Sequence, residues 1–354
     1  MKIKSFVFLI CLSAFTLLNA QDKDSVSFKE YFSNGKIATD GYKNSKNIKI
    51  GKWTWYFENG KEQMTGEYND KGWKIGLWQW FYSDGSLKKQ EVFTGNGENK
   101  AFYDNKQLYY SCKVEDGMKQ GDYKEYHKNG KLKMQGTYKD NELDGKVKWW
   151  FANSNPEMEG TLKAGKRDGH WIYYFHDSGN KNSEGDYVND KEEGRWIYYY
   201  ETKEKWRDGE YIHGKREGLW KTYYENGKIL HQGSYVNGKE EGIWISYFED
   251  GEIQMRGKFI GGNMDGKWEM YNSDGSHKTD VSYSDGLKNG TEILYDENGN
   301  IYQKADYTNG VLNGRWERYF NNKIVEKGSY KNGNKTGKWT FYDDRGKEIE
   351  SRSF

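Results

Sequence analysis

The sequence has few of the residues that kink, cross-link or charge a chain. It contains one proline and two cysteines in 354 residues. So little proline excludes collagen, polyproline segments and proline-rich linkers. The formal net charge is +1, and a chain so balanced has no general attraction to DNA, RNA or anionic lipid.

Aliphatic side chains are scarce as well. Hydrophobic residues make up 34% of the chain and aromatic residues alone 17%, which leaves too few Leu, Ile and Val for an ordinary aliphatic core. A low aliphatic content by itself favours disorder. The 15 Trp, 30 Tyr and 16 Phe residues argue against it, because disordered chains are poor in aromatic residues.

One long hydrophobic run is present, at residues 6–18, and it is preceded by Lys2 and Lys4. A small residue, Ala20, follows the run. The run is short for a membrane span, so it predicts a cleaved secretory signal peptide over residues 1–20, with an uncleaved anchor as the alternative. We therefore expect an exported protein that is periplasmic, displayed on the outer surface or secreted.

Removal of this segment takes away two lysines and Cys11, so the net charge falls from +1 to about −1 and Cys112 is left as the only cysteine. No disulfide within the mature chain is then possible. Residues 21–30 are expected to be a short lead-in. Residues 31–354 are expected to form a single array of repeats.

The repeat is anchored on a glycine that recurs every 23 to 25 residues. One longer step, from Gly76 to Gly121, is filled by a degenerate repeat that starts at Gly97. Self-similarity at this period indicates an array in which each repeat depends on its neighbours. The anchors are Gly51, Gly76, Gly121, Gly145, Gly169, Gly194, Gly218, Gly242, Gly266, Gly290, Gly314 and Gly337.

Aromatic residues follow each anchor at fixed positions. Trp stands two residues after the anchor in nine of the twelve repeats, and an aromatic residue stands five residues after it in all twelve. The repeats around 97–120 and 145–168 are irregular, and Glu292 stands where Trp is expected. The clearest structural anchors are Gly169, Trp171, Gly194, Trp196, Gly218, Trp220, Gly242, Trp244, Gly266 and Trp268. The tyrosines at the fifth position of the same repeats are Tyr174, Tyr199, Tyr223, Tyr247 and Tyr271.

Asn-Gly or Asp-Gly recurs at one phase of most repeats, as at residues 226–227 and 250–251. The flanking residues are Trp, Tyr, Phe, Ile and Thr, which favour strands, and Asn-Gly between such runs is a strong hairpin signal. No repeat shows a helical pattern of ten or more residues. The sequence thus predicts an all-β fold, an elongated single-layered antiparallel meander of about 13 hairpins.

A two-residue turn at 226–227 also predicts the register. Pairing outward from it places Glu225 opposite Lys228 and Trp220 opposite Gly233. Large rings would then lie over glycines of the partner strand and cover the bare backbone. One face of the sheet is expected to carry the Trp residues, and the other to be polar with a row of tyrosines.

The pattern Gly-x-Trp-x-x-Tyr-Tyr-x-Asn-Gly-Lys at 218–228, followed by Gly-x-Tyr-x-Asn-Gly at 233–238, resembles the bacterial variant of the MORN repeat. The resemblance runs from about residue 31 to the last residue. Some bacterial members of this family are known as YwqK-type antitoxins. The resemblance implies an elongated sheet of hairpins whose role is contact with protein or lipid, not catalysis.

Catalytic and metal-binding patterns are missing from the sequence. The six histidines fall at six different positions of the repeat, so no histidine column forms, and a metal site needs converging ligands. No nucleophile elbow and no phosphate-binding loop is present. We therefore predict no catalytic residue, no metal, no cofactor and no enzymatic activity. The histidines are His127, His170, His176, His213, His231 and His277.

Three weaker signals have simpler explanations. Residues 296–300 are rich in oxygen ligands like a calcium loop, but the same phase elsewhere is a hairpin turn. The paired glutamates at 192–193 and 240–241 lie in the turns between repeats, where we expect solvated charges. Cys112 is expected to be a buried or half-buried thiol.

We predict a non-enzymatic exported scaffold that binds an unidentified protein, with an antitoxin-like or immunity role as one form of it. The row of five tyrosines is the candidate binding surface, because rings give a large contact area at low entropy cost. A cell-wall or glycan binder is the alternative, since Trp/Tyr/Gly repeats also resemble choline- and glucan-binding repeats of shorter period. A membrane-surface lipid binder is the second alternative, disfavoured by the balanced charge. No nucleic-acid partner is expected.

Overall fold

The computed structural model describes residues 25–354, and every regular element in this range is a β-strand. The described chain divides into two compact units, one ending at Lys119 and the other beginning at Gln120. The boundary falls at the end of the irregular stretch 97–120. The signal peptide predicted for residues 1–20 lies outside the described residues. The single array over residues 31–354 stays a prediction.

The first unit is an antiparallel meander in which each strand pairs with the next along the chain. The expected lead-in already belongs to it, because β1 begins at Val26. Its strands are β1 (Val26–Tyr31), β2 (Ile37–Lys43), β3 (Lys49–Tyr56), β4 (Glu62–Tyr68), β5 (Lys74–Phe81), β6 (Leu87–Thr94), β7 (Gly97–Phe102) and β8 (Leu108–Glu115).

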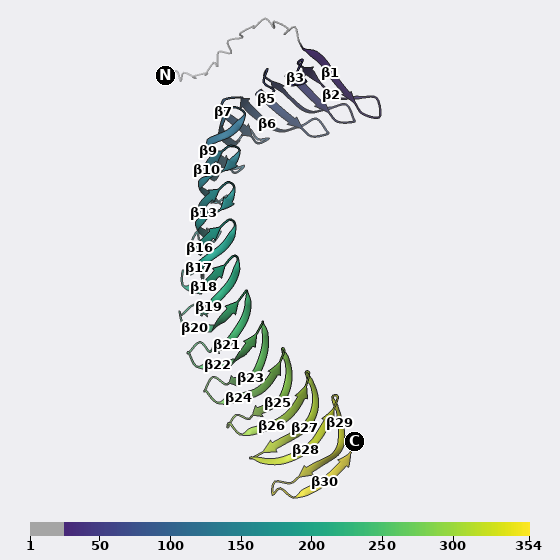
Figure 1. Ribbon diagram of the computed structural model, residues 1–354, viewed down its shortest axis with the longest axis vertical. Coiled ribbons are helices and arrows are strands. Elements are labelled where there is room, and N and C mark those ends of the chain that lie inside the picture. Colours follow the sequence, from purple (N-terminus) through teal and green to yellow (C-terminus); the bar gives the residue numbers. More distant parts are fainter. Residues whose placement is uncertain (1–24) are drawn as a thin grey trace, which may run out of the picture. The chain divides into compact units, whose positions relative to one another are not determined.

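The second unit repeats this arrangement, and Figure 1 shows its strands following one another in chain order. No second layer covers the described strands of this unit, so the predicted all-β meander of hairpins is confirmed. Its strands are β9 (Met118–Tyr126), β10 (Leu132–Lys139), β11 (Glu142–Leu143), β12 (Gly145–Trp150), β13 (Pro156–Lys163), β14 (Lys166–Arg167), β15 (Gly169–Tyr174), β16 (Lys181–Val188), β17 (Lys191–Tyr199), β18 (Lys205–Ile212), β19 (Lys215–Tyr223), β20 (Ile229–Val236), β21 (Lys239–Tyr247), β22 (Ile253–Ile260), β23 (Asn263–Tyr271), β24 (His277–Ser284), β25 (Leu287–Tyr295), β26 (Ile301–Thr308), β27 (Val311–Phe320), β28 (Lys323–Lys331), β29 (Asn334–Tyr342) and β30 (Glu348–Ser353).

The Asn-Gly turns are longer than predicted. In the β19–β20 hairpin the Tyr224 amide donates to the carbonyl of Lys228 at 2.8 Å, and Gly227 has a φ of +81° while Asn226 does not have a positive φ. This is a three-residue loop, a type I turn followed by a left-handed glycine. The predicted pairing of Glu225 with Lys228 is therefore wrong.

The predicted register of the strand bodies is nevertheless confirmed, with Trp220 opposite Gly233. The longer loop alone would shift the register by one residue. A β-bulge restores it, because Thr222 pairs with His231 while Tyr223 pairs with Ile229.

Two-residue turns do occur, but between the hairpins. Val188 pairs with Lys191, and the two residues between them both have positive φ, as a type I′ turn requires. The turns at 237–238, 261–262 and 285–286 have the same pair of positive φ values. Consecutive turns of this kind are joined by one backbone hydrogen bond, as from Gly238 to the Arg216 carbonyl at 2.9 Å.

Eight of the nine Trp residues at the second position of the repeat cover a glycine, but not the one predicted. The Trp220 ring lies over Gly209 of the preceding strand β18, where an added Cβ would come 2.2 Å from the indole. Gly233, its register partner, is covered by Trp244 of the next hairpin instead. The anchor Gly218 has a φ of +64° and forms a bulge against β18, which re-aims the Trp side chain.

This bulge also frees a carbonyl, which the indole uses. Trp220 Nε1 donates to the Glu210 carbonyl at 3.1 Å, and Trp171, Trp196 and Trp268 make the same bond at the same offset. Trp220 is 2% exposed. Tyr211 packs edge-on against its ring, with centroids 5.1 Å apart and an interplanar angle of 87°. Paired rings and glycines thus form the core, on what we call the Trp face, the side of the second unit that carries the buried Trp residues.

Candidate functional site

The opposite side of the second unit is its Tyr face, which carries the predicted row of tyrosines. These residues end five successive first strands of hairpins, β15, β17, β19, β21 and β23, and each is half-buried. In β19, Leu219, Lys221 and Tyr223 alternate with Trp220, which places them on this face. The structure therefore brings the predicted residues together in one row: Tyr174, Tyr199, Tyr223, Tyr247 and Tyr271.

Most hydroxyls in this row bond to polar side chains of the preceding hairpin, whereas Tyr271 donates to Glu269 of its own strand at 3.3 Å. Tyr199 donates to Glu184 Oε1 at 2.5 Å, and Tyr174 donates to Glu159. Gln232 Nε2 donates to the Tyr247 hydroxyl at 3.0 Å. The row is thus positioned by its neighbours, and the flat part of each ring is what remains for contact.

Burial and the adjacent carboxylates change the titration of these groups. Burial, followed by the hydrogen bond to Glu184, raises the pKa of Tyr199 to about 12. Burial and Asp208 likewise raise the pKa of Tyr223 to about 12. These tyrosines are neutral phenols at any physiological pH.

An exposed aliphatic stripe lies on the same face. Each of its side chains lies an even number of residues from a side chain of the same strand that is on the Tyr face. Val236 is four residues from Gln232, and Leu219 is four residues from Tyr223. The members are 45% to 62% exposed. The aliphatic stripe consists of Val188, Ile212, Leu219, Val236, Ile243 and Ile260.

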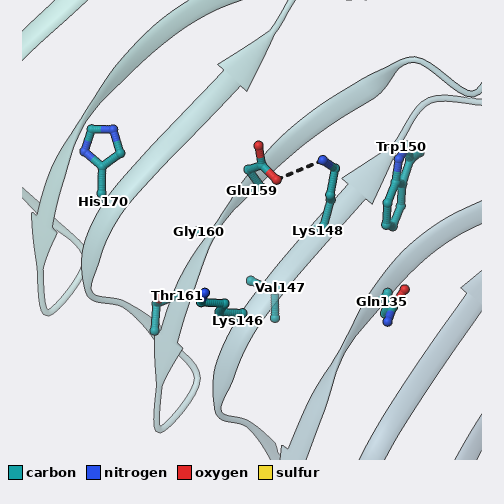
Figure 2. A pocket seen from close by; sticks show the side chains of 9 residues that line it. All are labelled: Gln135, Lys146, Val147, Lys148, Trp150, Glu159, Gly160, Thr161 and His170. Atoms are coloured by element: carbon teal, nitrogen blue, oxygen red, sulfur yellow. Dashed lines mark ion pairs between the residues drawn. The ribbon is translucent and has the colours of Figure 1, made fainter.

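A hollow opens on the second unit where the row begins, and Figure 2 shows the side chains around it. Trp150, at the fifth position of its repeat, takes the place of a row tyrosine. Polar side chains supply most of the remaining wall. The lining residues are Gln135, Lys146, Val147, Lys148, Trp150, Glu159, Gly160, Thr161 and His170.

An ion pair crosses the hollow, from Lys148 Nζ to Glu159 Oε2 at 2.9 Å (Figure 2). The hydrogen bond from Tyr174, followed by Lys148, lowers the pKa of Glu159. Lys148 Nζ also lies 5.7 Å from the Trp150 ring. The hollow therefore combines an aromatic ring with fixed donors and acceptors, a combination that suits binding and offers no activated nucleophile.

The acidic partners of the tyrosines were missed from the sequence. Glu159, Glu184 and Asp208 each stand directly before a glycine covered by Trp, so their shared phase is the signal that could have found them. The paired glutamates at 192–193 and 240–241 lie in strands β17 and β21, so their predicted place in the turns was wrong. Glu193 and Glu241 accept backbone N–H groups of the next turn at 2.9 Å.

Other candidate groups remain apart. His170 bonds Asp186 at 2.9 Å and Glu184 at 3.4 Å, and among the described residues no three His, Cys, Asp or Glu side chains converge as metal ligands would. Cys112, in the first unit, is a free thiol only 2% exposed, and burial raises its pKa. A buried protonated thiol is unreactive.

The hairpins match a known family. The model of the MORN repeat variant matches seven segments of the chain, distributed over both units. The chain is a MORN-repeat protein. The matched segments are 49–70, 74–94, 119–140, 216–237, 240–260, 288–309 and 312–332. Members of this family are typically not enzymes, which fits a repeat scaffold with an aromatic-rich β surface.

Other comparisons add little to the MORN repeats. No curated protein matches the chain. Among solved structures, it is similar to the one titled "Crystal Structure of TcdB2-TccC3 without hypervariable C-terminal region", at 11% identity over 93% of this chain and 23% of that one. The TM-score of 0.17 is too low to support an argument. Within the described residues, no helix is long and apolar enough to cross a membrane.

Proposed function

We propose that this MORN-repeat protein is a non-enzymatic exported scaffold whose Tyr face binds another protein. The aliphatic stripe, which shares the Tyr face with the tyrosine row, carries the proposal. Six exposed aliphatic side chains gathered on one open face are unusual for a surface without a partner. Aromatic residues on the same face are what the buried part of a protein interface favours.

The same observation weighs against the two alternative ligands. Sugars are bound by rings together with polar groups, and exposed Leu, Ile and Val side chains have no hydrogen bond to offer them. Anionic lipid would need an excess of positive charge, which the chain does not have. An immunity or antitoxin-like role is one form of protein binding that the resemblance to the family supports.

The test is a pull-down from cell-envelope extract with the mature chain. Three versions are compared: wild type, the triple variant Tyr199→Ser/Tyr223→Ser/Tyr247→Ser, and the stripe variant Leu219→Ser/Ile243→Ser. We expect the wild type to recover a defined protein and both variants to lose it. Tyr302→Ser removes an exposed ring elsewhere in the second unit and should retain the protein.

A glycan-binding function is the second candidate, and the hollow at Trp150 favours it. Retention of the wild type on peptidoglycan or polysaccharide beads, lost in Trp150→Ala and kept in the triple tyrosine variant, would replace the protein-binding proposal. Flotation of the wild type with liposomes of zwitterionic lipid would replace the protein-binding proposal with the lipid alternative.

A further inference from the structure

Three arginines of the second unit have no acidic partner among the described residues, and two of them lie on one face. Of the nine arginines in the sequence, Arg345 lies in an exposed turn, and Arg207 and Arg216 form no ion pair within the described part of the chain. Both lie on the Trp face. The other six are paired with carboxylates, as Arg167–Asp190, Arg195–Asp208, Arg256–Glu269, Arg315–Asp306, Arg318–Glu326 and Arg352–Glu350.

The two guanidinium groups share one ring. Their Cζ atoms lie 5.4 Å (Arg207) and 4.9 Å (Arg216) from the centroid of Trp220. Arg207 is also 5.0 Å from the ring of Tyr198 and 4.8 Å from that of Trp206. Trp206 is 38% exposed, so one of the rings beside the pair remains accessible.

One hydrogen-bond donor is left without a partner at this place. Arg207 Nε is buried and has no hydrogen-bond partner, and a buried polar group without a partner costs free energy. Arg216 Nη1 donates to the Tyr235 hydroxyl at 3.1 Å. Burial, followed by the charge of Arg216, lowers the pKa of Arg207, so a carboxylate placed beside it would stabilise the cation.

A third base completes the cluster. This base is His231. Thr222 pairs with Arg207 on one side and with His231 on the other, so Arg207, Thr222 and His231 form a row across β18, β19 and β20. Glu240 acts on the Tyr235 hydroxyl, and no ion pair joins either guanidinium to a carboxylate of the described residues. The cluster is therefore short of negative charge.

We propose that Arg207 and Arg216 bind an acidic peptide segment, with its carboxylates on the guanidinium groups and its neighbouring apolar atoms on the flanking rings. Guanidinium and carboxylate form strong paired hydrogen bonds, and arginine stacked on rings is typical of interfaces. A free inorganic anion would need an enclosing set of donors, whereas this site lies on an open face. The inference rests on the proposed function in that the ligand is a protein segment, but it uses the Trp face instead of the Tyr face.

The test measures binding of fluorescein-labelled hexaglutamate to the mature chain by fluorescence anisotropy at low ionic strength. Arg207→Gln and Arg216→Gln should each weaken binding about tenfold. Arg195→Gln and Arg256→Gln remove the same charge from the Tyr face and should change Kd by less than about twofold. Binding should also raise the pKa of His231, which burial and Arg207 hold below 6.5, as seen by NMR titration.

Two further samples keep the outcome clear. Arg207→Lys keeps the charge and should lose part of the affinity, with an unchanged circular dichroism spectrum showing that the fold is intact. The triple tyrosine variant should bind hexaglutamate like wild type, so failure of the Tyr-face proposal would be seen separately.

Three results would overturn the inference. The first is no binding of hexaglutamate to wild type. The second is equal weakening by all four glutamine variants, which would mean general charge attraction. The third is displacement of the peptide by inorganic phosphate at the peptide's own concentration, which would assign the pair to small anions.

Discussion

The strands β17 to β23 and the strands β24 and β25 of the second unit differ at two paired positions, those of the Trp and of the glycine that it covers. From β17 to β23 every repeat places a Trp over the glycine of the preceding strand, as Trp268 covers Gly257. In β24–β25 the same two positions hold Val281 and Glu292, and Glu292 is 7% exposed with its carboxylate 2.5 Å from Lys288 Nζ. The ring and the bare glycine have been lost together.

The next pair shows what happens when only one partner changes. Ala305 stands in the glycine position of β26. Like Trp244 over Gly233, Trp316 of β27 is half-buried. Its indole N–H makes no hydrogen bond to any residue that the structure describes. A Cβ and an indole compete for the same space, so the pair behaves as one structural element that must be exchanged as a whole.

The largest effect is expected from Trp220→Ala, which is compared with Trp316→Ala. Trp220→Ala should lower the free energy of unfolding by about 3–5 kcal/mol, because it removes a buried ring and its hydrogen bond and exposes Gly209. Trp316→Ala should cost less than half of that. Urea denaturation followed by far-UV circular dichroism measures both, and equal losses would mean that the glycine contact does not matter.

Gly209→Ala should cost about 1–3 kcal/mol, because the new Cβ meets the Trp220 indole. The same change in a Trp220→Ala background should cost much less, since the clashing ring is gone. Chemical denaturation of the wild type, the two single variants and the double variant gives the coupling free energy between Gly209 and Trp220. An unchanged cost in the second background would show that the glycine is needed for its backbone alone.

On the Tyr face, the contribution of one tyrosine to stability can be measured as a function of pH. Folding holds the Tyr199 pKa at about 12 against an ordinary 10.0, so the neutral phenol is favoured in the fold. This contribution is complete below pH 10 and is lost as the pH rises from 10 through about 12. Tyr199→Phe should flatten the loss of stability over that interval, and ultraviolet difference absorbance should show one fewer late-titrating phenol. A titration unchanged by the substitution would place the late phenol elsewhere.

The smallest effect concerns the turns between hairpins. Ala164 has a φ of +48° where the preceding and following repeats have Asp140 and Asn189, and the left-handed region costs a residue with a Cβ about 1 kcal/mol. Ala164→Gly should therefore raise the midpoint of thermal unfolding. Ala152→Gly, in a hairpin loop without positive φ, should leave it unchanged or lower it.

The fold and the strand register could be predicted because spacing determines both. Trp220 and Gly233 stand opposite each other as the Asn-Gly phase requires. The turn type could not be predicted, since the three-residue loop and the β-bulge before Tyr223 cancel in the register. The prediction of which glycine each Trp covers was also wrong, because the bulge at Gly218 turns the Trp220 ring toward the preceding strand.

The candidate site was predicted in part. The tyrosine row follows from the fifth position of the repeat. The aliphatic stripe does not, because Val236 and Ile212 resemble ordinary core residues of a strand, and their exposure depends on the Tyr face having no second layer. The arginine pair depends on contacts across three strands, which spacing alone does not show.

The pairing of ring and glycine is tested most directly by building it where it is missing. Val281→Gly and Glu292→Trp are made singly and together, and the free energy of unfolding of all four proteins is measured by urea denaturation. Each single change should destabilise the fold, one by exposing backbone and the other by a clash with Val281. The double variant should be more stable than the sum predicts by at least about 1 kcal/mol, with a new protected indole N–H signal by NMR. Strict additivity of the two changes would contradict the account.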